Sequence, residues 1–269
     1  MIEHGVVGFT GADQPDASIY NTCIRCGLCL PSCPTYLETM TETSGPRGRI
    51  SLIKAVGESR LDLLSPGFVE QMWECLDCRA CEAVCPSGVH YAQLIETARA
   101  QIRRAAAPAA EPRSGGWRTL VLQTLFARLD LMRAAAALLR FAQQTRLTAF
   151  AGMIGAARAV SLAPKISREF FVPRGQRYEA TDSRGTAFLH AGCIMQVAFP
   201  SVHRATVRML RRGGLSVVVP STQGCCGAIA LHAGEIDFTR ELAKRNIDAF
   251  ERSRADVYVV NAAGCGSAL

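Results

Sequence analysis

The sequence predicts an α+β chain of several domains: a helical cysteine-rich module, a basic helical linker, and an α/β domain with a parallel sheet. Two identical cysteine blocks lie near the start, and a Leu-, Ala- and Arg-rich stretch with helical spacing fills the middle. At the end, apolar runs alternate with amphipathic segments, the order of an α/β domain. A length of 269 residues also fits more than one domain. We place the boundaries at residues 1–105, 106–183 and 184–269.

The chain has 12 cysteines, and its N-terminus has neither the basic nor the apolar region of a secretory signal. We therefore expect a cytoplasmic location. Disulfides are rare in reducing compartments, and exposed thiols there serve as ligands or redox groups. Most of these cysteines are thus expected to hold metal or to react.

Eight cysteines form two blocks with the same spacing of 3, 3 and 4 residues, each closed by a proline. This C-x2-C-x2-C-x3-C-P run binds two [4Fe–4S] clusters in bacterial ferredoxins, where the fourth cysteine of each run binds the other cluster. When the ferredoxin pattern is applied to this sequence, it predicts one cluster bound by Cys23, Cys26, Cys29 and Cys85. It predicts the second on Cys75, Cys78, Cys81 and Cys33.

Two four-cysteine zinc sites, or a set of disulfides, are the alternatives for the same residues. Zinc sites pair separated C-x2-C motifs and need no third cysteine at the next two-residue gap, so the spacing favours iron–sulfur clusters. The 41 residues between the blocks contain a Gly-Pro-Arg-Gly turn and a short amphipathic helix, and residues 91–107 continue as a helix. Arg47 and Arg49, and Arg25 and Arg79 inside the cysteine loops, are candidates for stabilising a reduced cluster.

The net charge of +7 is unevenly distributed. Residues 1–98 carry 6 basic and 12 acidic groups, residues 99–180 carry 14 and 4, and residues 181–269 carry 10 and 7. In the middle segment, Arg128, Arg133, Arg140 and Arg146 recur near helical periods and leave broad apolar faces. Such helices pack on the rest of the protein, dock a partner subunit or lie on an anionic membrane surface. Nucleic acid binding is not expected, because interleaved aromatic residues and a recognition module are missing from the sequence.

Three apolar runs at residues 186–192, 215–221 and 256–262 read as strands, with helices at 201–214 and 237–254 between them. This βαβαβ order predicts a parallel sheet. The remaining cysteines, Cys193, Cys225, Cys226 and Cys265, each follow a strand. Because the carboxyl ends of parallel strands lie at one edge, we expect the four thiols to converge there.

This third cysteine group is a metal centre, a redox-active disulfide, a contact site for an electron donor or acceptor, or a set of buried structural thiols. Three histidines lie nearby in sequence. Of His190, His203 and His232, the first is the strongest candidate to assist, because it stands three residues before Cys193.

The chain resembles the iron–sulfur subunits of glycolate oxidases. The resemblance rests on the two cysteine blocks, on GPRGRISLIK between them, on CPSGVHY after the second, and on the later AGC, GCCGA and NAAGCGSAL segments. It implies an α-helical ferredoxin domain with two [4Fe–4S] clusters joined to a cysteine-rich "CCG" domain. It also implies a partner flavoprotein that oxidises glycolate to glyoxylate and passes electrons through the clusters towards a membrane quinone pool.

The expected function is therefore electron transfer, as a non-flavin subunit of a 2-hydroxy acid oxidoreductase. We expect the substrate site on a partner chain. We also expect peripheral membrane contact through the basic middle segment. No G-x-G-x-x-G motif opens a helix after a strand, so no flavin or nicotinamide site is expected here. Related subunits serve D-lactate, glycerol-3-phosphate and heterodisulfide enzymes, which are alternatives. A zinc-binding structural or assembly module is the alternative from a different class.

Two departures from the resemblance concern the last domain. The CCG pattern commonly ends in C-x2-C, but the position three after Cys265 is Ala268. Family members also carry a second CCG repeat, whereas this chain ends at Leu269. We therefore expect a first repeat only, in a C-terminally truncated chain.

Overall fold

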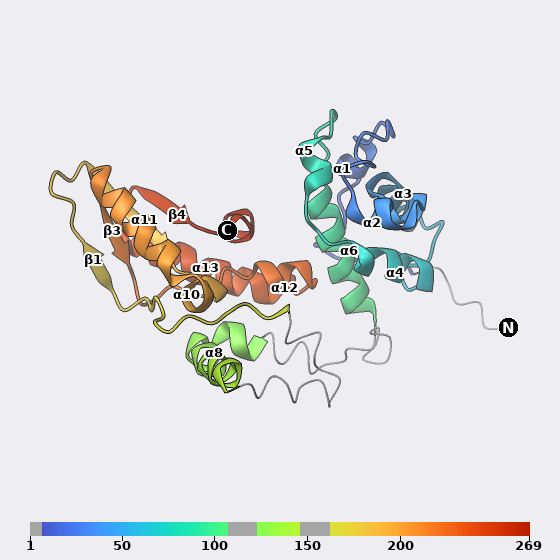
Figure 1. Ribbon diagram of the computed structural model, residues 1–269. Coiled ribbons are helices and arrows are strands. Elements are labelled where there is room, and N and C mark those ends of the chain that lie inside the picture. Colours follow the sequence, from blue (N-terminus) through green and yellow to red (C-terminus); the bar gives the residue numbers. More distant parts are fainter. Residues whose placement is uncertain (1–6, 107–122, 146–161) are drawn as a thin grey trace. The chain divides into compact units, whose positions relative to one another are not determined.

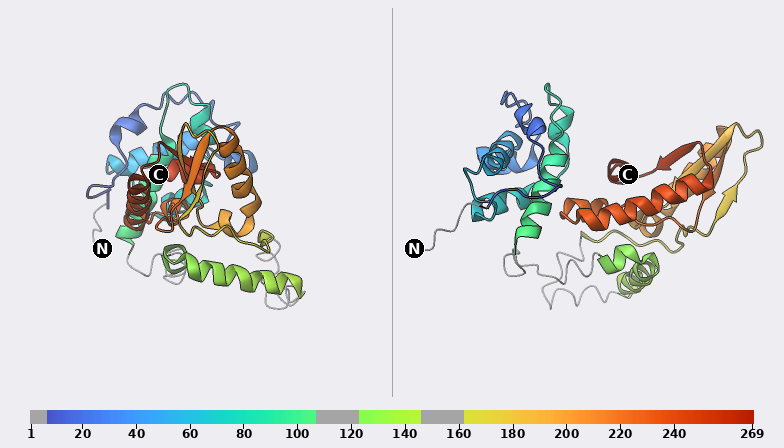
Figure 2. Two further views of the ribbon diagram at one scale, coloured as in Figure 1. Left: turned by 90° about the vertical axis from the view of Figure 1, so that its left-hand side faces the viewer. Right: turned by 180° about the vertical axis from the view of Figure 1, so that it is seen from behind.

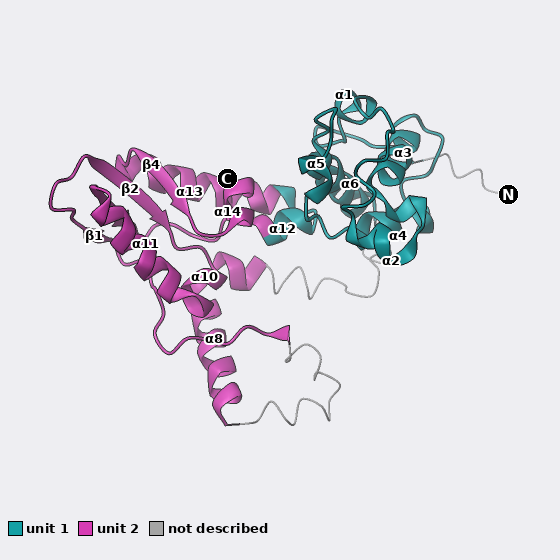
Figure 3. Ribbon diagram, turned by 45° about the horizontal axis from the view of Figure 1, so that its top comes forward, with its two compact units in different colours: residues 1–116, 229–236 teal, residues 117–228, 237–269 magenta. Residues whose placement is uncertain are grey.

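The computed structural model describes residues 7–106, 123–145 and 162–269. The chain divides into two compact units, one made of residues 1–116 and 229–236, the other of residues 117–228 and 237–269 (Figure 3). Each unit has its own core. Among the described residues, no helix has the length and apolar character needed to cross a membrane.

The first unit is helical. Its elements in residues 7–106 are α1 (Ala17–Asn21), α2 (Pro34–Thr39), the 3-10 helix η1 (Glu42–Ser44), α3 (Pro46–Gly57), α4 (Pro66–Glu74), α5 (Ala80–Ala83) and α6 (Tyr91–Ala105) (Figure 1). Proline begins α2, α3 and α4, where its missing N–H costs no helical hydrogen bond. The helices expected after the Gly-Pro-Arg-Gly stretch and from residue 91 are confirmed. That stretch itself is not a separate turn, because Gly45 is the N-cap of α3 and Pro46 its first residue.

The core of the first unit lies between α3, α4 and α6. Ile53, Met72, Leu94 and Ile95 are completely buried there. On α3, Ile53 lies three residues before Val56, so both side chains fall on one helix face, the pattern of an amphipathic helix. The second cysteine block lies between α4 and α6, so this packing fixes the two helices that border that block.

Gly48 lies where α3 passes close to the backbone of η1. A Cβ atom at this position would lie 2.0 Å from the carbonyl oxygen of Glu42, a backbone atom that cannot swing aside. We expect Gly48→Ala to destabilise the first unit by about 1–3 kcal/mol, the usual cost of overpacking. Gly67→Ala is the matched control, because that helical glycine has nothing within 4 Å of its Cβ position. Anaerobic thermal unfolding measures both variants, and equal melting temperatures would contradict the prediction.

The second unit combines a sheet with flanking helices. Its strands are β1 (Gln176–Tyr178), β2 (Gly185–His190), β3 (Leu215–Val219) and β4 (Val257–Val260). Its helices include α8 (Leu129–Gln144), α10 (Ile194–Ala198), α11 (Pro200–Arg212), α13 (Ile236–Ser253) and α14 (Ala263–Ala268). The division between the units falls within α12 (Ala228–His232) and at the start of α13.

The strand order is β1-β3-β2-β4, with β2 parallel to both β3 and β4. The predicted parallel sheet of three strands is therefore confirmed, and β1 adds an antiparallel edge strand that the sequence did not predict. Side chains alternate across the sheet: Leu189 and Val217 pack with Val207 of α11, whereas Phe188 packs with Ala249 of α13. The sheet accordingly lies between α11 and α13 (Figure 2).

Helix α8 comes from the basic middle of the sequence. Its buried residues Leu129, Met132 and Ala136 pack in one cluster with Cys193 and Cys225. Arg133 reaches the side-chain oxygen of Gln196 at 3.0 Å, and Arg140 reaches the carbonyl of Ile166 at 3.4 Å. Packing on the rest of the protein therefore accounts for one face of α8. Of the four predicted arginines, Arg146 lies outside the described residues.

Candidate metal centres

The two cysteine blocks occupy equivalent loops. The first follows α1, and Cys33 is the N-cap of α2; the second follows α4, and Cys75 is the C-cap of that helix. The backbone is left-handed two and four residues after the first cysteine of each block, at Arg25 (φ 58°) and Gly27 (φ 83°), and at Asp77 (φ 53°) and Arg79 (φ 59°). The sequence repeat is thus also a repeat of backbone conformation.

A first hollow, of about 410 Å³, is lined by three cysteines of the first block and by the last cysteine of the second. These four are Cys23, Cys26, Cys29 and Cys85. Cys33, the fourth cysteine of the first block, is not among the lining residues. Cys81 also reaches this hollow.

A second hollow, of about 310 Å³, shows the reciprocal arrangement. It is lined by Cys75, Cys78 and Cys81 of the second block together with Cys33 of the first. Each hollow is therefore lined by free thiols from both loops, five in the first hollow and four in the second, with Cys81 shared by both. Four thiols around one hollow are the donor set that a [4Fe–4S] cluster requires.

Donors of the chain are directed at the sulfur atoms. The N–H groups of Asp77 and Val89 donate to Cys75 Sγ and Cys85 Sγ, each at 3.4 Å, and the buried Tyr91 hydroxyl donates to Cys75 Sγ at 3.5 Å. Burial above all, together with the charge of neighbouring thiols, raises the pKa of the Cys81 thiol to about 12. A cysteine in this environment becomes a thiolate only when a cation compensates its charge, as a metal centre does.

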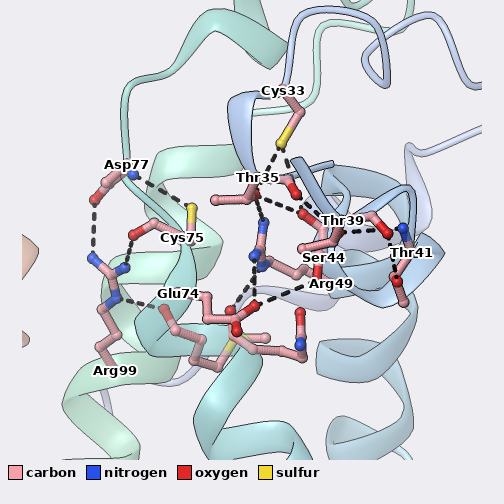
Figure 4. A network of polar contacts seen from close by, with 12 residues as sticks. Cys33, Thr35, Thr39, Thr41, Ser44, Arg49, Glu74, Cys75, Asp77 and Arg99 are labelled. Atoms are coloured by element: carbon pink, nitrogen blue, oxygen red, sulfur yellow. Dashed lines mark hydrogen bonds and ion pairs between the residues drawn. The ribbon is translucent and has the colours of Figure 1, made fainter. Parts of the chain in front are cut away.

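Arg49 is a completely buried cation at the wall of the second hollow. Its Nε donates to the carbonyl of Gln71 at 2.7 Å, one terminal nitrogen donates to Thr35 Oγ1 at 3.0 Å, and the other lies 3.9 Å from the Glu74 carboxylate (Figure 4). Arg79 lines the same hollow, while Arg25 and Arg47 line the first. All four candidate arginines therefore lie beside a hollow, and Arg49 is structurally the most constrained.

The third cysteine group lies at the carboxyl end of the sheet in the second unit. Cys193 is the N-cap of α10, Cys225 and Cys226 precede α12, and Cys265 lies in α14. Neighbouring thiols shift one another's pKa, in the order Cys193, Cys225, Cys226 and Cys265. Hydrogen bonds from its neighbours lower the pKa of Cys226, whereas the bond to Cys226 raises that of Cys265. The loops after three strands thus bring four thiols together.

Polar side chains fix the loops that carry these thiols. Gln223, itself buried, accepts from the N–H of Ala191 at 2.7 Å and donates to the carbonyl of Leu189 at 3.2 Å, which ties the ends of β2 and β3 together. Asn246 of α13 accepts from Gly224 N–H and donates to the carbonyl of Cys225, both at 2.9 Å. The positions of the thiols are therefore held by neutral hydrogen bonds.

The three candidate histidines have different environments. His190, at the end of β2, joins the thiols: one of its ring nitrogens and the sulfur atoms of Cys226 and Cys265 all lie within 4.8 Å of one another. His203 does not, because its Nε2 donates to Ala191 O at 3.1 Å and its Nδ1 accepts from Asn261 at 2.9 Å, and burial lowers its pKa to about 4. His232 lies in the first unit, 2.9 Å from Asp77 and 3.2 Å from Glu96, carboxylates that raise its pKa to about 9.

Comparison with known proteins identifies two domains. Residues 19–89 match the 4Fe–4S dicluster domain, and residues 187–269 match the cysteine-rich domain named CCG. The first match places iron–sulfur binding in the segment that contains both cysteine blocks. No solved structure gives a significant match.

The chain is similar over most of its length to several curated proteins. It is 36% identical to the probable glycolate oxidase iron-sulfur subunit of Bacillus subtilis over 92% of this chain and 57% of that protein. It is 31% identical to the glycolate oxidase iron-sulfur subunit of Escherichia coli over 93% of this chain and 58% of that protein. Lactate utilization protein A of Exiguobacterium is 38% identical over 28% of this chain and 31% of that protein. The chain spans a little over half the length of the two glycolate oxidase subunits.

Proposed function

We propose that this chain, which joins a 4Fe–4S dicluster domain to a CCG domain, is an electron-transfer iron–sulfur subunit of a flavin-dependent 2-hydroxy acid oxidoreductase. The observation that carries the proposal is the reciprocal lining of two hollows by the two cysteine blocks. The similarity to two glycolate oxidase iron-sulfur subunits and to a lactate utilization protein supports the class of substrate.

In this proposal, Cys23, Cys26, Cys29 and Cys85 hold one [4Fe–4S] cluster, and Cys75, Cys78, Cys81 and Cys33 hold the other. Bound clusters would supply one-electron transfer. The chain's own residues adjust how readily each cluster accepts the electron, since N–H and O–H donors to the sulfur atoms stabilise the more negative reduced state. Asp77 N–H and the Tyr91 hydroxyl act in this way on Cys75, and the charge of Arg49 acts from the wall of the second hollow.

Glycolate is the proposed substrate of the complex. A flavoprotein partner would oxidise it to glyoxylate, and the electrons would pass through this chain towards the quinone pool. A cytoplasmic location, peripheral membrane contact through the basic middle, and the domain boundaries at residues 105/106 and 183/184 belong to the same proposal. Residues 99–180 carry 14 basic and 4 acidic groups, and this excess of positive charge supports a role of the segment in docking.

Metal analysis and EPR of the anaerobically purified full chain test the proposal. We expect about eight irons per chain, four for each cubane cluster, and cluster signals after reduction. Stoichiometric zinc without iron would instead identify a structural zinc module. In cells, deletion of the gene should abolish glycolate-dependent dye reduction, and its persistence would reject glycolate as the substrate.

A further inference from the structure

The loop of the first cysteine block exposes large apolar side chains beside its hollow. Ile24 is 67% exposed and Leu28 is 59% exposed, and Cys26, which lies between them in sequence, is exposed as well. Ile24 and Cys26 both line the first hollow. Large apolar side chains gathered on a surface mark interaction sites, because their contact with water is unfavourable. The first hollow therefore borders a patch suited to contact with another molecule.

Arg25 places a positive charge in the same loop. Its side chain is exposed and makes no hydrogen bond or ion pair with any residue that the structure describes. The equivalent residue of the second block, Asp77, has the same left-handed backbone but is buried, 2.9 Å from His232 and 3.8 Å from Arg99. Of two equivalent positions, one is satisfied within the first unit and the other is left for a group from outside.

A small polar pocket of about 270 Å³ lies beside the first hollow. Arg25 and Lys54 both line it, and Cys23 lines the pocket as well as the hollow. Lys54 donates to the side-chain oxygen of Asn21 at 2.7 Å and lies 3.7 Å from the Glu58 carboxylate. One carboxylate against two cations leaves the pocket positive. An arginine fork binds a carboxylate through two hydrogen bonds, and a lysine adds its charge, so the pocket has the chemistry of a carboxylate site.

We propose that Ile24, Arg25 and Leu28, together with the pocket between Arg25 and Lys54, form the docking surface for the flavin-bearing partner chain. This inference rests on the proposed function. The partner places apolar side chains against Ile24 and Leu28 and an Asp or Glu carboxylate in the pocket. Interface centres combine apolar residues with arginine in this way. Docking brings the partner to the loop with three ligands of the proposed first cluster, so the electron that the reduced flavin loses is gained there.

The charge of the surrounding module limits which partner fits. Residues 1–98 carry 12 acidic and 6 basic groups, so the pocket is a local positive site on a negative module. A partner with a strongly acidic face would be repelled by the module as a whole. The surface therefore fits a largely apolar face with one or two carboxylates at the position of the pocket.

The full chain and its flavoprotein partner, produced together and purified anaerobically, test this proposal. The dissociation constant is measured by titrating the flavoprotein onto the immobilised chain and quantifying the bound flavin. Arg25→Glu and Ile24→Ser should each weaken the complex about 10-fold or more, the loss expected at the centre of an interface. Arg25→Lys should retain most of the affinity. Met209→Ser in α11 is the matched control, because Met209 is 66% exposed, and it should bind as the unchanged protein.

Electron transfer provides a second readout. In stopped-flow measurements, glycolate-reduced flavoprotein should reduce the clusters of Arg25→Glu about 10-fold more slowly at subsaturating partner concentration. Dithionite should reduce them as in the unchanged protein. Iron content and EPR are recorded for every variant. Lys54→Glu, which lies outside the cysteine loops, should weaken the complex similarly and decides the matter if a loop variant loses iron.

Unchanged dissociation constants in Arg25→Glu, Ile24→Ser and Lys54→Glu would overturn the docking surface. So would a complex weakened instead by Leu76→Ser, the exposed apolar residue at the equivalent position of the second loop. In both cases the chain would still hold iron and accept electrons, so the proposed electron relay would stand. Zinc in place of iron would reject the proposed function, and this inference with it.

Discussion

Replacing Cys85 with alanine is expected to halve the iron content, from about eight atoms per chain to about four. Its thiol lines the first hollow together with Cys23, Cys26 and Cys29, although its own block lines the second. A cubane with three thiolate ligands is more easily lost or degraded than one with four. Iron analysis and EPR of the anaerobic variant measure the effect.

Double variants distinguish reciprocal binding from binding within each block. If Cys85 and Cys23 serve one cluster, the variant lacking both retains about four irons, the same as either single variant. The variant lacking Cys85 and Cys75 should then lose both clusters. Binding within each block predicts the opposite pair of results, so the two double variants serve as controls for each other. Cys33→Ala with Cys75→Ala repeats the test for the second hollow.

Arg49→Leu is expected to have the second large effect, on stability and on one reduction potential. The substitution removes donors from the Gln71 carbonyl and from Thr35, and leaves Glu74 without its cation. Each buried acceptor left without its donor costs about 1–3 kcal/mol, whereas Glu74, with a side chain 40% exposed, is hydrated by water. Anaerobic denaturant unfolding of the full chain measures the loss.

The potential of the second cluster should fall in the same variant, because a positive charge that favours the reduced state is gone from its hollow. Arg49→Lys is the matched control, because lysine keeps the charge but cannot donate to both Gln71 and Thr35 as the guanidinium does. Its stability should therefore fall, while the potential stays near that of the unchanged protein. EPR-monitored titration follows the potential. An unchanged potential in Arg49→Leu would remove Arg49 from the tuning of the cluster.

The helices and parallel strands could be predicted because their side chains repeat with clear periods. β1 could not, because Gln176–Tyr178 is a three-residue polar strand whose pairing depends on β3. The Gly-Pro-Arg-Gly stretch contains turn residues, yet Pro46 suits the first position of a helix equally well and packing decides the outcome.

At the candidate sites, spacing singled out the cysteines but few of the residues that contact them. Tyr91 ends the CPSGVHY segment and Tyr258 lies in a predicted strand, but neither sequence position indicates a contact with a candidate site, so only the tertiary structure identifies these contacts. Sequence proximity to Cys193 singled out His190, yet could not establish that its Nε2 lacks a partner. Whether a histidine binds a ligand or packs depends on neighbours that are distant in sequence, as His203 and Asn261 illustrate.

The two hollows share a wall, since Pro46, Cys81 and Tyr91 line both of them. Charge placed on one side of so thin and apolar a partition is poorly screened on the other. If each hollow holds a cluster, as proposed, the first electron to enter this unit would oppose the second, and the two redox couples would titrate as an interacting pair with potentials that belong to the pair. Such a unit would favour carrying one electron at a time, and would divide the two-electron oxidation of a substrate on a partner into single steps.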